Sequence, residues 1–220
     1  MTGTRLILAR HGNTVAPDEA PRRVGITDLA LVARGREQAQ MLGQHLRAQA
    51  LLADRIITSG LQRTREMATH IQQQWPHPVP CTVDTFLNEI DYGVDENQPE
   101  TAVRARLGEA ALMNWERHAL PPPGWSVDPQ ALRTGWHERA QRWATHHAGE
   151  TLLILTSNGI ARFAPSLTGD FAAFARANPL KLAPGAYGLL ICETEGKAEK
   201  APGWYCAGWN IRPARQQPSP

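Results

Sequence analysis

Cysteine is scarce in this sequence, and long hydrophobic runs are absent. Its 220 residues include only Cys81, Cys192 and Cys206, with no C-x-x-C pair and an odd number overall. That pattern argues against a disulfide framework and indicates a reducing compartment. No apolar run approaches the ~20 residues that a bilayer span needs, and the N-terminus lacks a signal-peptide pattern. We therefore expect a soluble, cytoplasmic protein that does not bind membranes.

A strong excess of one charge is also missing. The 23 lysines and arginines against 21 acidic residues give a net charge of +2, and no basic block points to a nucleic-acid partner. With 42% hydrophobic and 20% charged residues, the composition is that of a globular chain. This length fits a single domain, 1–220, that needs neither disulfide nor metal to fold.

Three short apolar runs, 6–9, 56–57 and 152–155, predict buried strands. Their apolar character is continuous rather than alternating, as in a mainly parallel sheet covered on both faces. Between them, the proline-free stretches 33–52 and 61–74 are rich in helix-forming residues and predict helices. This alternation predicts an α/β fold, a three-layer αβα sandwich with a mainly parallel central sheet.

Residues 94–148 predict a helical insertion that lies over the C-terminal ends of the strands. Helices are expected over 99–120 and 129–146, separated by the break Pro121-Pro122-Pro123-Gly124. Four tryptophans fall in or near this insertion, with Trp136 and Trp143 seven residues apart on one helix face. They form either an aromatic roof over a substrate or, as is more common, a packing contact with the core.

The C-terminal region predicts further strands. Residues 181–193 suggest a hairpin that turns at Pro184-Gly185, and 203–209 suggests a final strand. The tail 212–220 is expected to be disordered. An exposed edge on the final strand would permit a homodimer, whereas a covered edge would not, so the oligomeric state is left open.

Polar clusters follow the three predicted strands, and a fourth lies in a loop. They are RHGNT (10–14), TSGLQRT (58–64), LNEIDYG (87–93) and TSNGIAR (156–162). Ligands of open α/β sheets bind beyond the carboxyl ends of the strands. We therefore expect these clusters to meet at one cation-rich crevice, although each alone is compatible with an ordinary loop or helix start.

Single residues in these clusters suit phosphate chemistry. His11 lies at the crevice edge, and Gly12 lets the backbone approach a ligand closely. Ser59 is predicted to cap a helix whose first turn carries Arg63, and a guanidinium near a helix N-terminus suits an anion. Glu89 lies between apolar neighbours that would raise its pKa and let it give a proton to a leaving oxygen.

The fourth cluster predicts a helix over 160–167 that points its N-terminus at the same crevice. His137, His146 and His147 lack the Cys or carboxylate partners of a metal site. We expect neither a metal nor another cofactor.

The chain contains, in this order, the pieces LILARHGNT, ITDLALVARGREQAQ, TSGLQRTREMA, LNEIDYG and TSNGIARF. Together these pieces resemble the histidine phosphatase superfamily, which includes the phosphoglycerate mutases. The resemblance covers about residues 4–93 and 150–190. It implies that His11 is a nucleophile that forms a phosphohistidine and that Arg10 and Arg63 clamp the phosphoryl oxygens. It further implies that Glu89 is the acid/base, and Asn13 and Thr14 would line the pocket.

One position departs from the family pattern. Asn158, followed by Gly159, stands where the family usually has a second histidine followed by glycine. Both residues are expected to bind phosphate or substrate. Asparagine keeps an N–H donor but no charge, and a neutral hydrogen bond contributes about 1 kcal/mol against ~1.5–3 kcal/mol for a charged one. The change should weaken the pocket without abolishing phosphate binding.

Three functions follow from this pattern. The leading one is a metal-independent phosphomonoesterase acting on a small phosphorylated metabolite or a phosphoprotein. The alternative, motivated by Asn158, is a phospho-ligand-binding or regulatory protein with weak or no catalysis. A phosphoglycerate-type mutase ranks third. Glu96-Asn97 replaces the W-E-G sequence that relatives carry after the acid loop, so the substrate cannot be inferred from them.

Overall fold

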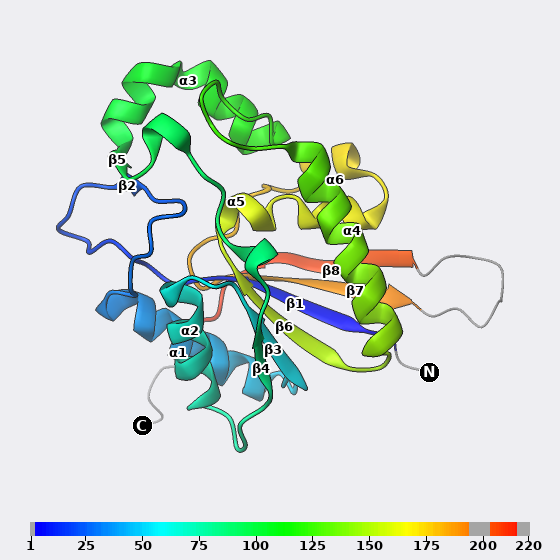
Figure 1. The fold of residues 1–220 in the computed structure, drawn as a ribbon. Helices are drawn as coiled ribbons and strands as arrows, with labels where there is room; N and C mark the ends of the chain where they lie inside the picture. The colour runs from blue at the N-terminus through cyan, green and yellow to red at the C-terminus, as the bar shows by residue number, and fades with distance from the viewer. Residues whose placement is uncertain (1–2, 194–202, 215–220) are drawn as a thin grey trace.

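The computed structural model describes residues 3–193 and 203–214. A six-stranded sheet forms its centre, with the strands in the order β4-β3-β6-β1-β7-β8 (Figure 1). These strands are β1 (Arg5–Arg10), β3 (Arg55–Thr58), β4 (Cys81–Val83), β6 (Thr151–Thr156), β7 (Tyr187–Glu193) and β8 (Gly203–Ile211). A separate two-stranded sheet pairs β2 (Arg22–Arg23) with β5 (Gln98–Pro99).

The sheet is mainly parallel, as the apolar runs predict. β1 pairs in parallel with β6, β6 with β3, and β3 with β4. β7 runs antiparallel to both β1 and β8. The three parallel strands that the sequence predicts therefore lie side by side, and their carboxyl ends meet at one edge of the sheet.

Helices cover both faces of this sheet. They are α1 (Ala33–Ala48), α2 (Gln62–Gln72), α3 (Glu100–His118), α4 (Pro129–His146), α5 (Asn158–Ala161) and α6 (Phe171–Ala177). Short 3-10 helices span Thr85–Leu87 (η1), Gly93–Asp95 (η2) and Ala164–Thr168 (η3). Asp128 caps α4 by accepting from the N–H groups of Gln130 and Ala131, with Pro129 in the first turn.

Alternate residues of each central strand pack into two different cores. Ile7 and Ala9 of β1 join the core under α1 and α2. Leu6 and Leu8 join the other core, which includes Trp136 of α4. Because both faces of the strand are buried, its sequence reads as a continuous apolar run. The three-layer architecture predicted from the sequence is confirmed.

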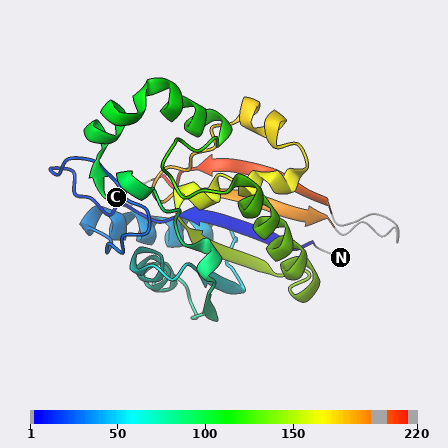
Figure 2. The same cartoon turned by 45° about the horizontal axis from the view of Figure 1, so that its top comes forward.

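The two long helices of the middle region occupy different places. Figures 1 and 2 show α3 on the side of the molecule where β1 ends, together with the small β2–β5 sheet. By contrast, α4 lies along one face of the sheet (Figure 2). Of the predicted insertion, therefore, α3 and the segment before it approach the strand ends, while α4 forms part of a covering layer.

The tryptophans of the middle region serve packing. Trp115, Trp125, Trp136 and Trp143 are all buried. The rings of Trp115 and Trp125 meet edge to face with centroids 5.3 Å apart, and Trp136 meets Trp143 at 6.4 Å. The packing alternative is confirmed.

Three local predictions are wrong. Residues 181–186 are a loop rather than the first strand of a hairpin, and β7 pairs instead with β1 and β8. The helix expected over 160–167 is the short α5 followed by the 3-10 turn η3, since Pro165 cannot continue an α-helical ladder. Ser59 does not cap α2 because the N-cap position is Leu61. The Ser59 hydroxyl instead lies 2.7 Å from that of Thr64.

The predicted disorder of the tail 212–220 falls largely outside the described residues. Residues 212–214 form no helix or strand, and 215–220 are not described. In the described part of the chain, no helix is long and apolar enough to cross a membrane.

Candidate active site

A cavity of about 260 Å³ opens where β1 and β6 end. Six of the eight residues singled out from the sequence line it: Arg10, His11, Asn13, Thr14, Glu89 and Asn158. Arg63 and Gly159 are not among its lining residues. The strand-end clusters thus converge, but Arg63 and Gly159 lie outside the set of residues that line the cavity.

His11 directly follows β1 and is 8% exposed. Its backbone N–H donates to the Thr156 carbonyl at the end of β6, which fixes the start of the loop. Burial lowers the pKa of His11 well below its usual value, and the charges of Arg63 and Arg10 lower it further. The ring is therefore neutral near pH 7.

The orientation of the His11 ring decides which nitrogen can react. Nδ1 lies 2.7 Å from the Gly12 carbonyl oxygen, an acceptor, so Nδ1 carries the hydrogen in the neutral ring. Nε2 then keeps its lone pair. A neutral imidazole with a free Nε2 is the form that can attack an electrophile.

Gly12 lines the cavity and also lies close to the start of α1. A Cβ at this position would overlap the backbone of Gly35 in α1. This tight contact sets the loop that carries His11 against the start of α1. The close approach of the Gly12 backbone to a ligand stays a prediction.

Arg10 is held by the loop between α6 and β7. Its Nη1 donates to the Leu182 carbonyl at 2.8 Å, while its Nε is buried without a partner among the described residues. Burial lowers the pKa of Arg10, and the charge of Glu89 is the largest influence in the opposite direction. A guanidinium with donors left over, next to His11, suits an incoming anion.

Arg63 is fully buried and binds its own protein. Nη1 donates to the Thr27 carbonyl at 2.8 Å, and Nη2 donates to the Gly25 carbonyl at 2.6 Å. Its Nε faces the Ser157 hydroxyl at 3.4 Å. The structure thus places the charge of Arg63 close enough to depress the pKa of His11, while its forked donors bind loop carbonyls.

Glu89 is 6% exposed, and both of its carboxylate oxygens accept backbone hydrogen bonds. Oε1 accepts from the N–H of Ile90 and Oε2 from the N–H of Gly159, each at 3.0 Å. A Cβ on residue 159 would overlap the Glu89 carboxylate and the Ile90 side chain. Gly159 therefore positions Glu89 and does not itself line the cavity.

Asn158 presents a donor to the cavity. Its Oδ1 accepts from the Leu182 N–H at 3.0 Å, which fixes the orientation of the amide. The Nδ2 group is left for a ligand. Asn13 and Thr14 also line the cavity, and the Asn13 N–H donates to Gln38 Oε1 at 2.8 Å.

Several cavity residues were not predicted from the sequence. They are Arg22, Arg23, Tyr92, Glu100, Glu116 and Lys181, together with the less polar Val15, Pro21, Val24 and Pro184. The adjacent arginines before Gly25 form a basic pair, which the sequence could have marked as a candidate anion-binding feature. Glu116 and Lys181 gave no such signal, because no local pattern marks which residues of α3 and of the loop after α6 line the cavity.

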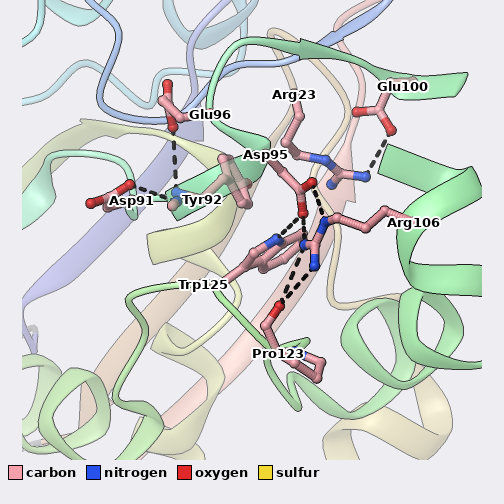
Figure 3. A network of polar contacts seen from close by, with 10 residues as sticks. Arg23, Asp91, Tyr92, Asp95, Glu96, Glu100, Arg106, Pro123 and Trp125 are labelled. Atoms are coloured by element: carbon pink, nitrogen blue, oxygen red, sulfur yellow. Dashed lines mark hydrogen bonds and ion pairs between the residues drawn. The ribbon is translucent and has the colours of Figure 1, made fainter. Parts of the chain in front are cut away.

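Figure 3 shows how the segment after Glu89 is built. Arg23 pairs with Glu100 at 2.8 Å and lies over the rings of Tyr92 and Trp125, with its guanidinium carbon 5.4 and 5.3 Å from their centroids. Asp95 accepts from Trp125 Nε1 at 2.7 Å and pairs with Arg106. These contacts tie α3 to the wall of the cavity.

Within the described ranges 3–193 and 203–214, no group of three or more His, Cys, Asp or Glu side chains is arranged to hold a metal ion. The positively charged residues that line the site are Arg10, Arg22, Arg23 and Lys181.

Curated relatives align with part of this chain. The 2,3-bisphosphoglycerate-dependent phosphoglycerate mutase of Bartonella quintana is 33% identical over 123 residues, which is 55% of this chain and 59% of that protein. The mutase of the same name from Chelativorans sp. is 34% identical over 126 residues, 56% of this chain and 60% of that protein. The chain thus matches less than two thirds of the length of these relatives.

Solved structures share the fold over nearly the whole chain. The α-ribazole phosphatase of Shigella flexneri superposes with a TM-score of 0.70 at 22% identity, covering 97% of this chain and 99% of that one. A mycobacterial glucosyl-3-phosphoglycerate phosphatase gives 0.77 at 19% identity, covering 94% and 99%.

The family model for branch 1 of the histidine phosphatase superfamily matches residues 6–200, from the first strand through β7. With that match, and with a histidine at the end of β1 in a cavity lined by arginine and glutamate, the chain belongs to the histidine phosphatase superfamily.

Proposed function

We propose that this protein is a metal-independent phosphomonoesterase that works through a phosphohistidine on His11. The observation that carries the proposal is the state of that side chain. His11 is buried and neutral, with Nδ1 on the Gly12 carbonyl and Nε2 free, and it lines the same cavity as Arg10 and Glu89.

In the first step, Nε2 of His11 forms a bond to phosphorus while the bond from phosphorus to the ester oxygen breaks. Glu89, as the acid, gives a proton to the departing oxygen. In the second step, water attacks phosphorus, the bond from phosphorus to Nε2 breaks, and Glu89 takes a proton from that water. Phosphate leaves, and both side chains return to their starting forms.

Arg10 supplies the charge that the transferring phosphoryl group needs. Arg10 lines the cavity beside His11 and has donors beyond the one that binds the Leu182 carbonyl, and the Nδ2 group of Asn158 adds a neutral donor. Fixed donors of this kind stabilise charge on the equatorial oxygens without a metal. Arg63 adds to the positive potential through its position behind the wall.

The names of related proteins agree with this chemistry. The structural neighbours include an α-ribazole phosphatase and a glucosyl-3-phosphoglycerate phosphatase, and the curated relatives are phosphoglycerate mutases. All of these names describe transfer or hydrolysis of a phosphoryl group. A cavity of about 260 Å³ favours a small phosphorylated metabolite over a phosphoprotein, and a cytoplasmic location fits such a substrate.

The proposal is tested with p-nitrophenyl phosphate, with and without EDTA, between about pH 5 and 8. We expect phosphate release that EDTA does not affect and that His11→Ala abolishes while the protein stays folded by circular dichroism. Trapping of acid-labile phosphate on wild type but not on His11→Ala would identify the intermediate. Full activity in folded His11→Ala would overturn the proposal.

Asn158 favours a second candidate, a phospho-ligand-binding protein with little turnover. An amide donor carries no charge, and Asn158 lines the cavity at the position of the family's second histidine. This candidate predicts binding of inorganic phosphate without hydrolysis, and a gain of hydrolysis in Asn158→His. Rapid hydrolysis by wild type would exclude it. A mutase would instead transfer phosphate from a bisphosphate donor without net release.

A further inference from the structure

The cavity extends beyond the place where the phosphoryl group would bind. Besides His11 and Arg10, its charged lining residues are Arg22, Arg23, Glu89, Glu100, Glu116 and Lys181. A phosphomonoester with phosphorus next to His11 must place its leaving group among these charges. The charged lining therefore affects which alcohol can leave.

The charges of this lining are not equally free. Arg22 is exposed and donates to the Asn97 carbonyl, with no carboxylate partner among the described residues. Arg23 is paired with Glu100 at 2.8 Å and covered by two aromatic rings, so the two side chains largely neutralise each other. Glu116, in the last turn of α3, is half-buried and makes no hydrogen bond or ion pair with any described residue. Lys181 is exposed.

Glu116 thus offers the cavity an unpaired carboxylate. Its charge reaches inward, since it raises the pKa of both Arg10 and Arg162 against the effect of burial. A carboxylate of this kind accepts hydrogen bonds from hydroxyl groups and repels anions. Arg23 and Lys181 can donate to the oxygens of the same hydroxyls.

We propose that Glu116 determines specificity: the enzyme accepts phosphomonoesters of uncharged, polyhydroxylated alcohols and disfavours those whose leaving group bears a carboxylate or a second phosphate. This inference rests on the proposed function, since it concerns the leaving group of that reaction. It also opposes the mutase alternative, because a bisphosphate would have to place an anion beside Glu116.

Two substrates test the effect of a negative charge on the leaving group. Glycerol 3-phosphate and 3-phosphoglycerate differ in one end of the leaving group, a hydroxymethyl in the first and a carboxylate in the second. Wild type is expected to have the higher kcat/KM for glycerol 3-phosphate. Glu116→Gln should shift the ratio of the two kcat/KM values about tenfold toward 3-phosphoglycerate, mainly through KM.

Glu109→Gln is the matched control. Glu109 lies on the same helix, is exposed, pairs with Arg104 and does not line the cavity. It loses the same charge and should leave the ratio unchanged. A merely structural role of Glu116 would lower both rates together without changing their ratio. An unchanged ratio in Glu116→Gln, or a wild-type preference for 3-phosphoglycerate, would overturn the inference.

Binding separates this inference from the proposed function. The dissociation constants of both esters are measured calorimetrically on His11→Ala and on His11→Ala with Glu116→Gln. If wild type hydrolyses nothing, the proposed function fails while the ratio of the dissociation constants still tests Glu116. The expected shift of that ratio is again about tenfold, and no shift would overturn the role of Glu116.

Discussion

His11 combines two properties that usually oppose each other, burial and reactivity. The fold keeps its ring neutral by removing water and by placing Arg63 and Arg10 nearby. The same neutrality leaves Nε2 able to attack phosphorus. We therefore expect this side chain to affect stability as well as the proposed reaction.

That effect predicts a pH dependence of the free energy of unfolding. The pKa of His11 is lowered on folding from 6.5, so the unfolded chain binds a proton that the folded chain rejects. The stability linked to His11 is present above pH 6.5 and is lost as the pH falls from there toward the folded pKa. Between about pH 7.5 and 5.5, wild type should lose about 1.4 kcal/mol more than His11→Asn.

Urea unfolding of both proteins across this range measures the difference. Comparison with His11→Asn removes the contribution of His45, whose pKa is also lowered by burial. Parallel pH profiles for the two proteins would show that His11 takes up its proton equally well in the folded state, contrary to the prediction.

At the scale of single residues, the part of the site around His11 could be predicted because short pieces of sequence carry it. The RHG piece and Glu89 mark the cavity, since each directly follows a strand or lies in the loop beside it. The roles of Arg63 and Gly159 could not be predicted. Their contacts, with the carbonyls of Gly25 and Thr27 and with Glu89, join segments that are far apart in sequence.

At the scale of elements, the loop 25–27 holds Arg63 and is itself held by Glu96. Oε1 of Glu96 accepts from the N–H of Gly25 at 2.9 Å and from the N–H and hydroxyl of Thr27 at 3.0 and 2.7 Å. Burial raises the pKa of Glu96, but hydrogen bonds led by Thr27 outweigh it and lower the pKa overall. The Glu96 carboxylate therefore connects the segment after Glu89 to the loop 25–27 that binds Arg63.

Glu96→Ala should loosen this loop. We expect a loss of about 1–3 kcal/mol in the free energy of unfolding, because three donors lose their acceptor. We also expect kcat to fall by roughly tenfold to a hundredfold, because Arg63 loses its fixed position. Glu96→Gln keeps one acceptor oxygen, so its kcat and its free energy of unfolding should lie between those of wild type and Glu96→Ala. Steady-state kinetics and urea unfolding test this, and an unaltered kcat in Glu96→Ala would contradict it.

Elements were predictable where their pattern is local. The bounds of α4 agree with the prediction, and β1, β3 and β6 contain the three apolar runs. β4 was missed because its residues are exposed and show no apolar run. The hairpin at Pro184-Gly185 was wrong for a tertiary reason, since residues 182 and 185 bind Arg10 and Asn158.

At the scale of the whole molecule, β1 lies inside the sheet and depends on the distant half of the chain. Its neighbours are β6 and β7, which lie at 151–156 and 187–193. A fragment of residues 1–150 contains neither of them. We predict that this fragment does not fold, whereas the full chain unfolds cooperatively.

Circular dichroism and limited proteolysis of the purified fragment provide the measurement. The expected result is rapid cleavage throughout, including within α1, whose apolar face packs on β1 and β6. Protection of α1 and α2 in the fragment would show that this half folds without its partners.

The position of β1 also orders the events of biosynthesis. β1 and His11 leave the ribosome before the other strands of the sheet, yet β1 gains its second neighbour only when residues 187–193 have been made. Until β6 and β7 have been made, the apolar segment Leu6 to Ala9 of β1 has no neighbouring strand to pair with. Such a nascent chain exposes an apolar segment early and depends on late, long-range pairing, so we expect the sheet to close around β1 only after β7 has been made.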